Sequence, residues 1–139
     1  MRVVTHIRTA APADLPAVFE LQSTVPEAAQ WNDYSHADLL LAEHDGRIAG
    51  FLATRRIAPH ESEVLNLAVD PALRRNGIAC RLLARFVQDQ PGDVFLEVRE
   101  SNSTAQKLYE AFGFQRVGLR KAYYENPSES AVVMKMHSC

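Results

Sequence analysis

The stretch from Val69 to Cys80 has the residue types of an anion-binding loop. It reads VDPALRRNGIAC, so a strand end passes through two arginines and one glycine into an apolar-periodic helix. Gly77 can adopt a positive φ and bring its backbone close to a phosphate. The first N–H groups of the following helix have no internal partners, and Arg74 and Arg75 add positive charge. The spacing fits neither a P-loop nor a dinucleotide fingerprint, so we expect a diphosphate ligand that is neither a nucleoside triphosphate nor NAD.

The composition is that of an ordinary globular protein. The chain has 139 residues, 47% hydrophobic content, 23% charged content and a net charge of −2. We therefore expect one domain over residues 1–139 with a single core and no general attraction to nucleic acid or membrane. No signal peptide or membrane-length apolar run is present in the sequence, which favours the cytoplasm. Cys80 and Cys139 are too few for a disulfide framework, and the five histidines have no metal-binding spacing.

The predicted elements follow the order of a mixed sheet with helices on both faces. Strands are expected over residues 3–8, 40–43, 48–57, 62–69, 94–98, 114–124 and 131–136. Helices are expected from Pro12, from Ile78 to the Pro91-Gly92 stop and from about Asn102 to Gly113, with a short one ending near Leu39. An Asp45-Gly46 turn should join two of the strands as a hairpin. This pattern predicts an α/β (α+β mixed) fold.

Two separated motifs resemble the GNAT N-acetyltransferases. Residues 65–71 (LNLAVDP) followed by residues 74–79 (RRNGIA) are similar to the acetyl-CoA motif of that family. Residues 96–102 (LEVRESN) and 108–114 (LYEAFGF) resemble its RimI branch, which acetylates the α-amine of ribosomal-protein N-termini. The resemblance extends from about Glu63 to Tyr124. It implies the GNAT acyl-CoA N-acyltransferase fold, with about seven strands and about four helices, and acetyl-CoA as co-substrate.

The resemblance gives catalytic roles to Glu97 and Tyr109. An α-amine has a reference pKa of about 8, so a modest base is enough to deprotonate it. Glu97 stands at the catalytic glutamate of the branch, and an apolar setting would strengthen it as a base. Tyr109 stands at the catalytic tyrosine, the acid for the leaving thiolate. From the residues alone, Glu97 is more simply a surface residue paired with Arg99, and Tyr109 a packed aromatic ring whose hydroxyl could still serve catalysis.

The resemblance also implies which residues bind the cofactor. The backbone of Leu67, Ala68 and Val69 is the expected dock for the pantetheine arm, and its N–H groups could form an oxyanion hole. The diphosphate is assigned to Arg74, Arg75, Asn76, Gly77, Ile78 and Ala79. Asn102 should cap a helix in any case, where Ser103 and Gln106 fit a capping box, and the resemblance adds a contact of Asn102 with the cofactor.

The chain departs from the branch pattern at three positions. Asn76 and Cys80 stand where basic residues are frequent, a loss for which Arg75 and Arg81 could compensate. Ala122 stands where asparagine is common, which leaves the details of peptide-end recognition open. An acetyl-cysteine route through Cys80 is disfavoured because no histidine lies near it in the sequence, and packing inside the helix is the simpler interpretation.

The acceptor side has the weakest signals. Basic ribosomal tails would suit an acidic rim, for which the candidates are Glu27, Asp33, Glu61 and Glu63. Trp31 and Tyr34, in the irregular segment from Val25, could line a substrate groove, although packing in the core or at a hinge is the favoured interpretation.

We therefore expect an acetyl-CoA-dependent enzyme that acetylates the N-terminal alanine of a small-subunit ribosomal protein by direct attack. The same chemistry on a small amine or a lysine stays open, as does a non-catalytic CoA-binding sensor, although Glu97 and Tyr109 argue against the sensor. Nucleic-acid binding is least expected because the cofactor accounts for the basic loop. A metal is not expected, and the protein should be a monomer or a homodimer.

Overall fold

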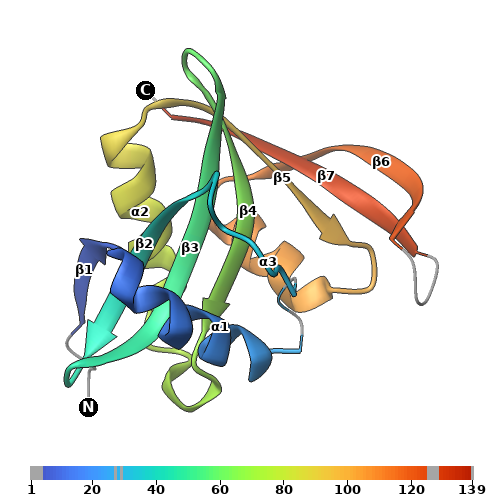
Figure 1. Ribbon diagram of the computed structural model, residues 1–139. Coiled ribbons are helices and arrows are strands. Elements are labelled where there is room, and N and C mark those ends of the chain that lie inside the picture. The colour runs from blue at the N-terminus through green and yellow to red at the C-terminus, as the bar shows by residue number, and fades with distance from the viewer. Residues whose placement is uncertain (1–4, 27, 29, 125–128, 139) are drawn as a thin grey trace. The chain divides into compact units, whose positions relative to one another are not determined.

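A computed structural model describes residues 5–26, 28, 30–124 and 129–138 (Figure 1). Its strands are β1 (His6–Thr9), β2 (Asp38–His44), β3 (Arg47–Ala58), β4 (Glu61–Val69), β5 (Gly92–Arg99), β6 (Gln115–Tyr124) and β7 (Glu129–Ser138). Its helices are α1 (Leu15–Ser23), α2 (Ile78–Asp89) and α3 (Ser103–Phe112), with short 3₁₀ helices η1 (Pro12–Asp14) and η2 (Pro71–Leu73). Within these residues, no helix is long and apolar enough to cross a membrane.

The strands form the predicted mixed sheet. Their hydrogen-bonded order is β1-β2-β3-β4-β5-β7-β6, with β4 and β5 parallel and the other recorded pairs antiparallel. Residues fall into two compact units: Met1–Arg55 with Leu65–Gln90 form unit 1, and Arg56–Val64 with Pro91–Cys139 form unit 2. The α/β class is confirmed, whereas the single domain over residues 1–139 stays a prediction.

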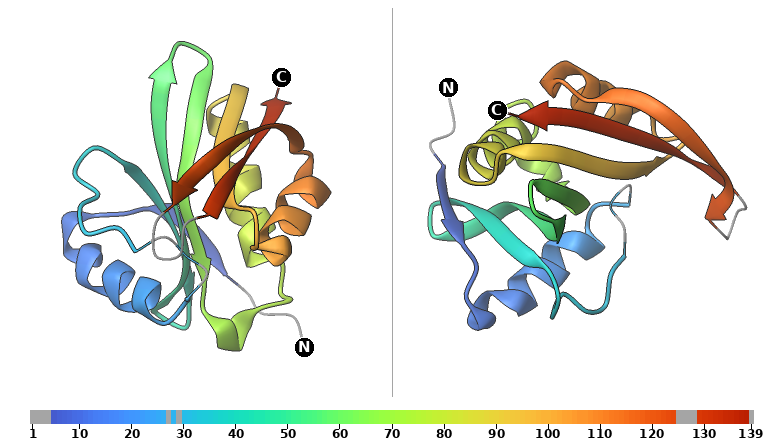
Figure 2. Two further views of the ribbon diagram at one scale, coloured as in Figure 1. Left: turned by 90° about the vertical axis from the view of Figure 1, so that its right-hand side faces the viewer. Right: turned by 90° about the horizontal axis from the view of Figure 1, so that it is seen from above.

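In unit 1, α1 and α2 lie on opposite faces of the strands (Figures 1 and 2). Val18 of α1 belongs to one buried cluster with Leu41 and Phe51, which face each other across β2 and β3. Adjacent strand positions point to the other face. There Gly50 allows α2 a close approach, because a Cβ on Gly50 would lie 3.2 Å from Cγ2 of Ile78.

The hairpin between β2 and β3 has the predicted turn. Asp45 and Gly46 both adopt positive φ, 53° and 72°, as a type I′ turn requires. The predicted short helix ending near Leu39 is wrong. Residues 35–37 form a turn, and β2 begins at Asp38 because Leu39 and Leu41 alternate into the core with the period of a strand. The predicted strand from Val3 starts at His6 in the described residues.

One extra residue in β6, a strand of unit 2, changes which of its side chains share a face. Arg116 pairs with Met134, but the next pair along the strand joins Gly118, and not Val117, to Val133. Val117 therefore forms a β-bulge. Because side chains alternate with period two, a shift of one position moves every later residue of β6 to the other face.

Unit 2 also contains a backbone position that only glycine can occupy. Gly92 begins β5 with φ of +134°, and a Cβ placed on it would lie 2.3 Å from the carbonyl oxygen of His60. That oxygen accepts a hydrogen bond from the N–H of Asp93 at 2.8 Å, so the clash would fall on a backbone that is already engaged.

We predict that Gly92→Ala lowers the free energy of unfolding by about 3 kcal/mol, because strain and a backbone clash act together. Urea unfolding followed by circular dichroism measures the change. Gly118→Ala is the matched control, because its new Cβ would make only an ordinary contact, 3.9 Å from Cβ of Val133. Equal stability of the two variants would contradict the assignment of strain to Gly92.

Candidate active site

The predicted cofactor loop of unit 1 ends in an open helix start. Gly77 is the N-cap of α2 and adopts the left-handed conformation, with φ of 74° and ψ of 16°. No side chain caps this end of the helix, and a Cβ on Gly77 would meet no atom within 4 Å. Arg74 and Arg75 are both exposed beside it. The loop therefore presents backbone N–H groups and two guanidinium groups, which fits the diphosphate of acetyl-CoA.

Asn76 holds the loop together from inside. Its Nδ2 donates to the carbonyl oxygens of Leu73 at 2.9 Å and Arg74 at 3.1 Å. Asp70 supports the start of the loop, because its Oδ1 accepts a hydrogen bond from the N–H of Ala72 at 2.9 Å. Asn76 is therefore a brace for the loop backbone.

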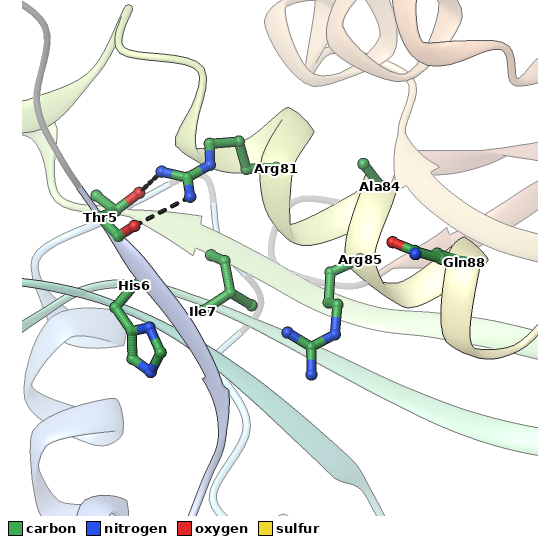
Figure 3. A pocket seen from close by; sticks show the side chains of 7 residues that line it. All are labelled: Thr5, His6, Ile7, Arg81, Ala84, Arg85 and Gln88. Atoms are coloured by element: carbon green, nitrogen blue, oxygen red, sulfur yellow. Dashed lines mark hydrogen bonds between the residues drawn. The ribbon is translucent and has the colours of Figure 1, made fainter.

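Three residues at the start of α2 differ from their predicted roles. Cys80 is exposed, so its interpretation as a packing residue is wrong. Ile78 is buried at 2% exposure, so its side chain belongs to the core and only its backbone is left for a ligand. Arg81 was expected to compensate for the positive charge missing at Asn76 and Cys80, but it is engaged elsewhere. Its guanidinium hydrogen-bonds the hydroxyl and the carbonyl oxygen of Thr5 (Figure 3).

These Arg81 contacts lie at an open pocket of about 420 Å³ between the start of β1 and α2 (Figure 3). Arg81, Arg85 and Gln88 line it from the helix, and Thr5, His6 and Ile7 line it from the other side. No residue predicted to bind the cofactor or to act in catalysis lines this pocket. It is a surface feature of unit 1 that is separate from the glycine loop.

A buried hydrogen-bond network precedes the predicted pantetheine dock. Tyr34 donates its hydroxyl hydrogen to Oε1 of Gln22, and Nδ2 of Asn66 donates to the Tyr34 hydroxyl oxygen at 2.9 Å. Oδ1 of Asn66 accepts the N–H of Leu67 at 3.0 Å. That N–H was predicted to contact the pantetheine arm or the acetyl carbonyl, but in this structure it is engaged by Asn66. Ala68 is buried and Val69 half-buried, so their contribution would come from the backbone.

The two aromatic residues of the irregular segment have different environments. Tyr34 is 5% exposed and packs against the rings of Phe19 and Phe51, so its interpretation as a core residue is confirmed. Burial raises the pKa of the Tyr34 phenol. Trp31 stacks on Tyr34 but is 39% exposed, and its carbonyl oxygen accepts a hydrogen bond from Nε2 of Gln22 at 2.7 Å. Gln22 and Asn66 were not predicted for this network, because a polar residue on a core face gives no sequence signal of its partner.

In unit 2, Glu97 is held by an arginine that the sequence did not point to. Glu97 is half-buried on β5, on the face opposite to Leu96 and Val98. Its Oε1 accepts a hydrogen bond from Nη1 of Arg120 at 2.6 Å. The alternative pairing with Arg99 is wrong, since Arg99 binds Glu129 instead. The hydrogen bond to Glu97 raises the pKa of Arg120.

Tyr109 and Asn102 both belong to α3, also in unit 2. Tyr109 is buried, and its ring meets that of Phe114 edge-on at 5.5 Å, as expected for a packed aromatic residue. Asn102 is the N-cap, with its Oδ1 accepting the N–H of Ala105 at 3.1 Å. The predicted capping box is wrong, because Gln106 donates to the carbonyl oxygens of Arg99 and Glu100 and Ser103 is already inside the helix.

The residues proposed for an acidic rim are divided between the two units. Asp33 belongs to unit 1, where the backbone N–H of Ser35 donates to it and lowers its pKa. Glu61 and Glu63 are half-buried on β4 in unit 2, and Glu27 lies outside the described residues. The side chain of Ala122 is also outside them. In the described part of the chain, no group of three or more His, Cys, Asp or Glu residues could hold a metal ion.

Comparisons with known proteins agree on one family. The acetyltransferase (GNAT) family model matches residues 6–114. The N-alpha-acetyltransferase RimI of Mycobacterium tuberculosis is 38% identical over 74% of this chain and 68% of its own length. The [ribosomal protein bS18]-alanine N-acetyltransferase of Haemophilus ducreyi is 37% identical over 73% of this chain and 74% of its own. The crystal structure of the ribosomal-protein-S18-alanine N-acetyltransferase from Escherichia coli superposes with a TM-score of 0.83 at 26% identity, covering 97% of this chain and 94% of that one.

We predict that Tyr34→Phe lowers the free energy of unfolding at pH 7 by about 1–3 kcal/mol, because it takes a hydrogen-bond partner from buried Gln22 and Asn66. The folded state keeps the Tyr34 proton to higher pH than the unfolded state, whose phenol loses it at about pH 10. The tyrosine's contribution is therefore complete below that pH and is lost as the pH rises through the raised value. Urea titrations from pH 7 to 11 should show the two proteins converging above about pH 10; a constant difference would contradict this account.

We also predict that replacing Arg74 and Arg75 together by glutamine weakens acetyl-CoA binding about tenfold, because two charge-assisted contacts to the diphosphate are lost. Isothermal titration calorimetry measures the dissociation constant. Arg85→Gln is the matched control, since Arg85 is also exposed in unit 1 but pairs with Asp89 on α2. Unchanged binding by the double variant would place the diphosphate elsewhere.

Proposed function

This chain belongs to the acetyltransferase (GNAT) family, and we propose that it transfers the acetyl group of acetyl-CoA to the N-terminal α-amine of a ribosomal protein. The acceptor residue we propose is alanine. The observation that carries the proposal is the identity of 37–38% to two enzymes whose names specify α-amine or ribosomal-protein alanine acetylation. A cytoplasmic location and a monomeric or homodimeric state remain predictions.

The donor side of the proposal rests on unit 1. The open N-terminus of α2 at Gly77, with Arg74 and Arg75 beside it, suits a diphosphate. We assign the pantetheine arm to the backbone of residues 67–69. We also assign to Asn102, in unit 2, a contact with the cofactor in addition to its capping role. Binding at Leu67 would require its N–H to exchange Oδ1 of Asn66 for the ligand.

The reaction needs two proton transfers. Acetyl-CoA supplies the acetyl group as a thioester; the amine nitrogen forms a bond to the carbonyl carbon, and the carbon–sulfur bond breaks. We assign Glu97 the proton that leaves the amine, directly or through a water, and Tyr109 the proton delivered to sulfur. The products are an N-acetyl peptide and the CoA thiol. A proton then returns from Glu97 to Tyr109 through solvent, so the proton count is unchanged.

The acceptor is tested with two peptides and acetyl-CoA. One is a basic ribosomal-type tail that begins with alanine, and the other is the same tail with a blocked N-terminus and free lysines. We expect turnover of the first alone, because an α-amine is the easier group to deprotonate at neutral pH. Turnover of the second peptide alone would indicate that the acceptor is a lysine or a small amine. If the protein binds acetyl-CoA but acetylates neither peptide, a sensor is indicated.

The catalytic assignment predicts that Glu97→Gln and Tyr109→Phe each lower kcat about 10²-fold, with little change in acetyl-CoA affinity. Phenylalanine keeps the ring packed against Phe114, so the fold should survive. Glu100→Gln is the matched control for the carboxylate, because Glu100 is exposed and three residues away. Steady-state kinetics with the alanine peptide measure the effect, and full activity of Glu97→Gln would remove Glu97 from the mechanism.

A further inference from the structure

The β-bulge of unit 2 decides where Arg120 points. After the bulge at Val117, Arg120 pairs with Ala131 of β7, and Ala131 in turn pairs with Arg99 of β5. Glu97 lies two positions from Arg99 and so shares its face. Without the extra residue, Arg120 would be opposite Ser130 and would point to the other face of the sheet. The irregularity in β6 is thus what brings the guanidinium to Glu97.

Arg120 is fixed on both of its sides. Nη1 donates to Oε1 of Glu97 at 2.6 Å, and the guanidinium carbon lies 4.2 Å from the ring centroid of Tyr123 in a cation–π contact. Glu63 adds an attractive charge from β4. One oxygen of the Glu97 carboxylate, Oε1, is thus anchored by Arg120.

Besides Glu97 and Arg120, this face carries further charged groups: Glu61, Glu63, Asp93, Arg99, Glu129, Lys135 and His137. Arg99 binds Glu129, while Lys135 and His137 both bind Asp93. Within the described part of the chain, Arg120 is the cation of this face that hydrogen-bonds Glu97.

We propose that Arg120 is a positioning residue for catalysis, one that orients the carboxylate of Glu97 for taking the proton of the acceptor amine. This inference rests on the proposed function and on Glu97 as its base. A cation this close disfavours a second cation, the protonated amine, at the same place. Arg120 therefore promotes the neutral, reactive form of the bound amine at neutral pH, and the acid limb of the kcat profile reports that deprotonation.

The test is the pH profile of kcat for the alanine peptide in Arg120→Gln, Arg120→Lys and the wild type. We expect Arg120→Gln to move the acid limb to higher pH by about 0.5–1 unit and to lower kcat at pH 7 about three- to tenfold, because the charge that disfavours the protonated amine is lost. In Arg120→Lys the acid limb should lie close to its wild-type pH, since lysine retains the positive charge although it lacks the fork geometry of the guanidinium. KM for acetyl-CoA should not change in any variant.

Arg116→Gln is the matched control, an exposed arginine of the same strand that pairs with Met134 before the bulge. Its profile should match the wild type. Far-UV circular dichroism and the urea midpoint establish whether each variant is folded. If Arg120→Gln does not fold, the pH profiles of Arg120→Lys and Arg120→Met are compared instead, because these two side chains have similar length and differ in charge.

Two failures can be told apart. A uniform loss of kcat at every pH, or no change at all, would overturn the role of Arg120 while acetylation of the alanine peptide by the wild type still stands. Wild-type activity in Glu97→Gln would overturn the assignment of the base itself, whatever Arg120 does.

Discussion

The hydrogen bonds among Gln22, Tyr34 and Asn66 are the interaction on which the order of unit 1 depends. They join the end of α1, the irregular segment and β4, which lie far apart in the chain. A buried amide or phenol that loses its partner destabilises the fold, so these three side chains constrain one another. Asn66 also accepts the N–H of Leu67, which links the network to the backbone of β4.

The sites proposed in the two units each contain a backbone irregularity supported by regular neighbours. In unit 1, a left-handed Gly77 leaves the start of α2 open to a ligand, and Asn76 keeps the loop around it in shape. In unit 2, the extra residue Val117 turns β6 so that Arg120 meets Glu97. Strands β4 and β5 alternate buried and half-buried residues along their whole length, so regular, well-packed structure supports these irregular points.

Most of the fold could be predicted from local patterns. Period-two alternation in β4 and β5, the Asp45-Gly46 turn and the stop of α3 at Gly113 each depend on residues within a few positions of one another. The partner of Glu97 could not be predicted in this way. Arg99 is the nearer arginine in the sequence, but register and a bulge decide the contact, and neither has a local signature. The helix expected before Leu39 failed for a related reason, because leucines at short spacing suit a strand as well as a helix.

The bulge in β6 has a second effect, on self-association. β6 is the last strand in the hydrogen-bonded order, and Val117, Leu119 and Tyr123 on it are 40–55% exposed. A long, flat, apolar edge would be a template for the strands of other molecules and a start for aggregation. Two register irregularities interrupt this edge, and Arg116 and Lys121 place exposed cations along it. The distortion that places Arg120 beside Glu97 therefore also makes this edge a poorer template for the strand of another molecule.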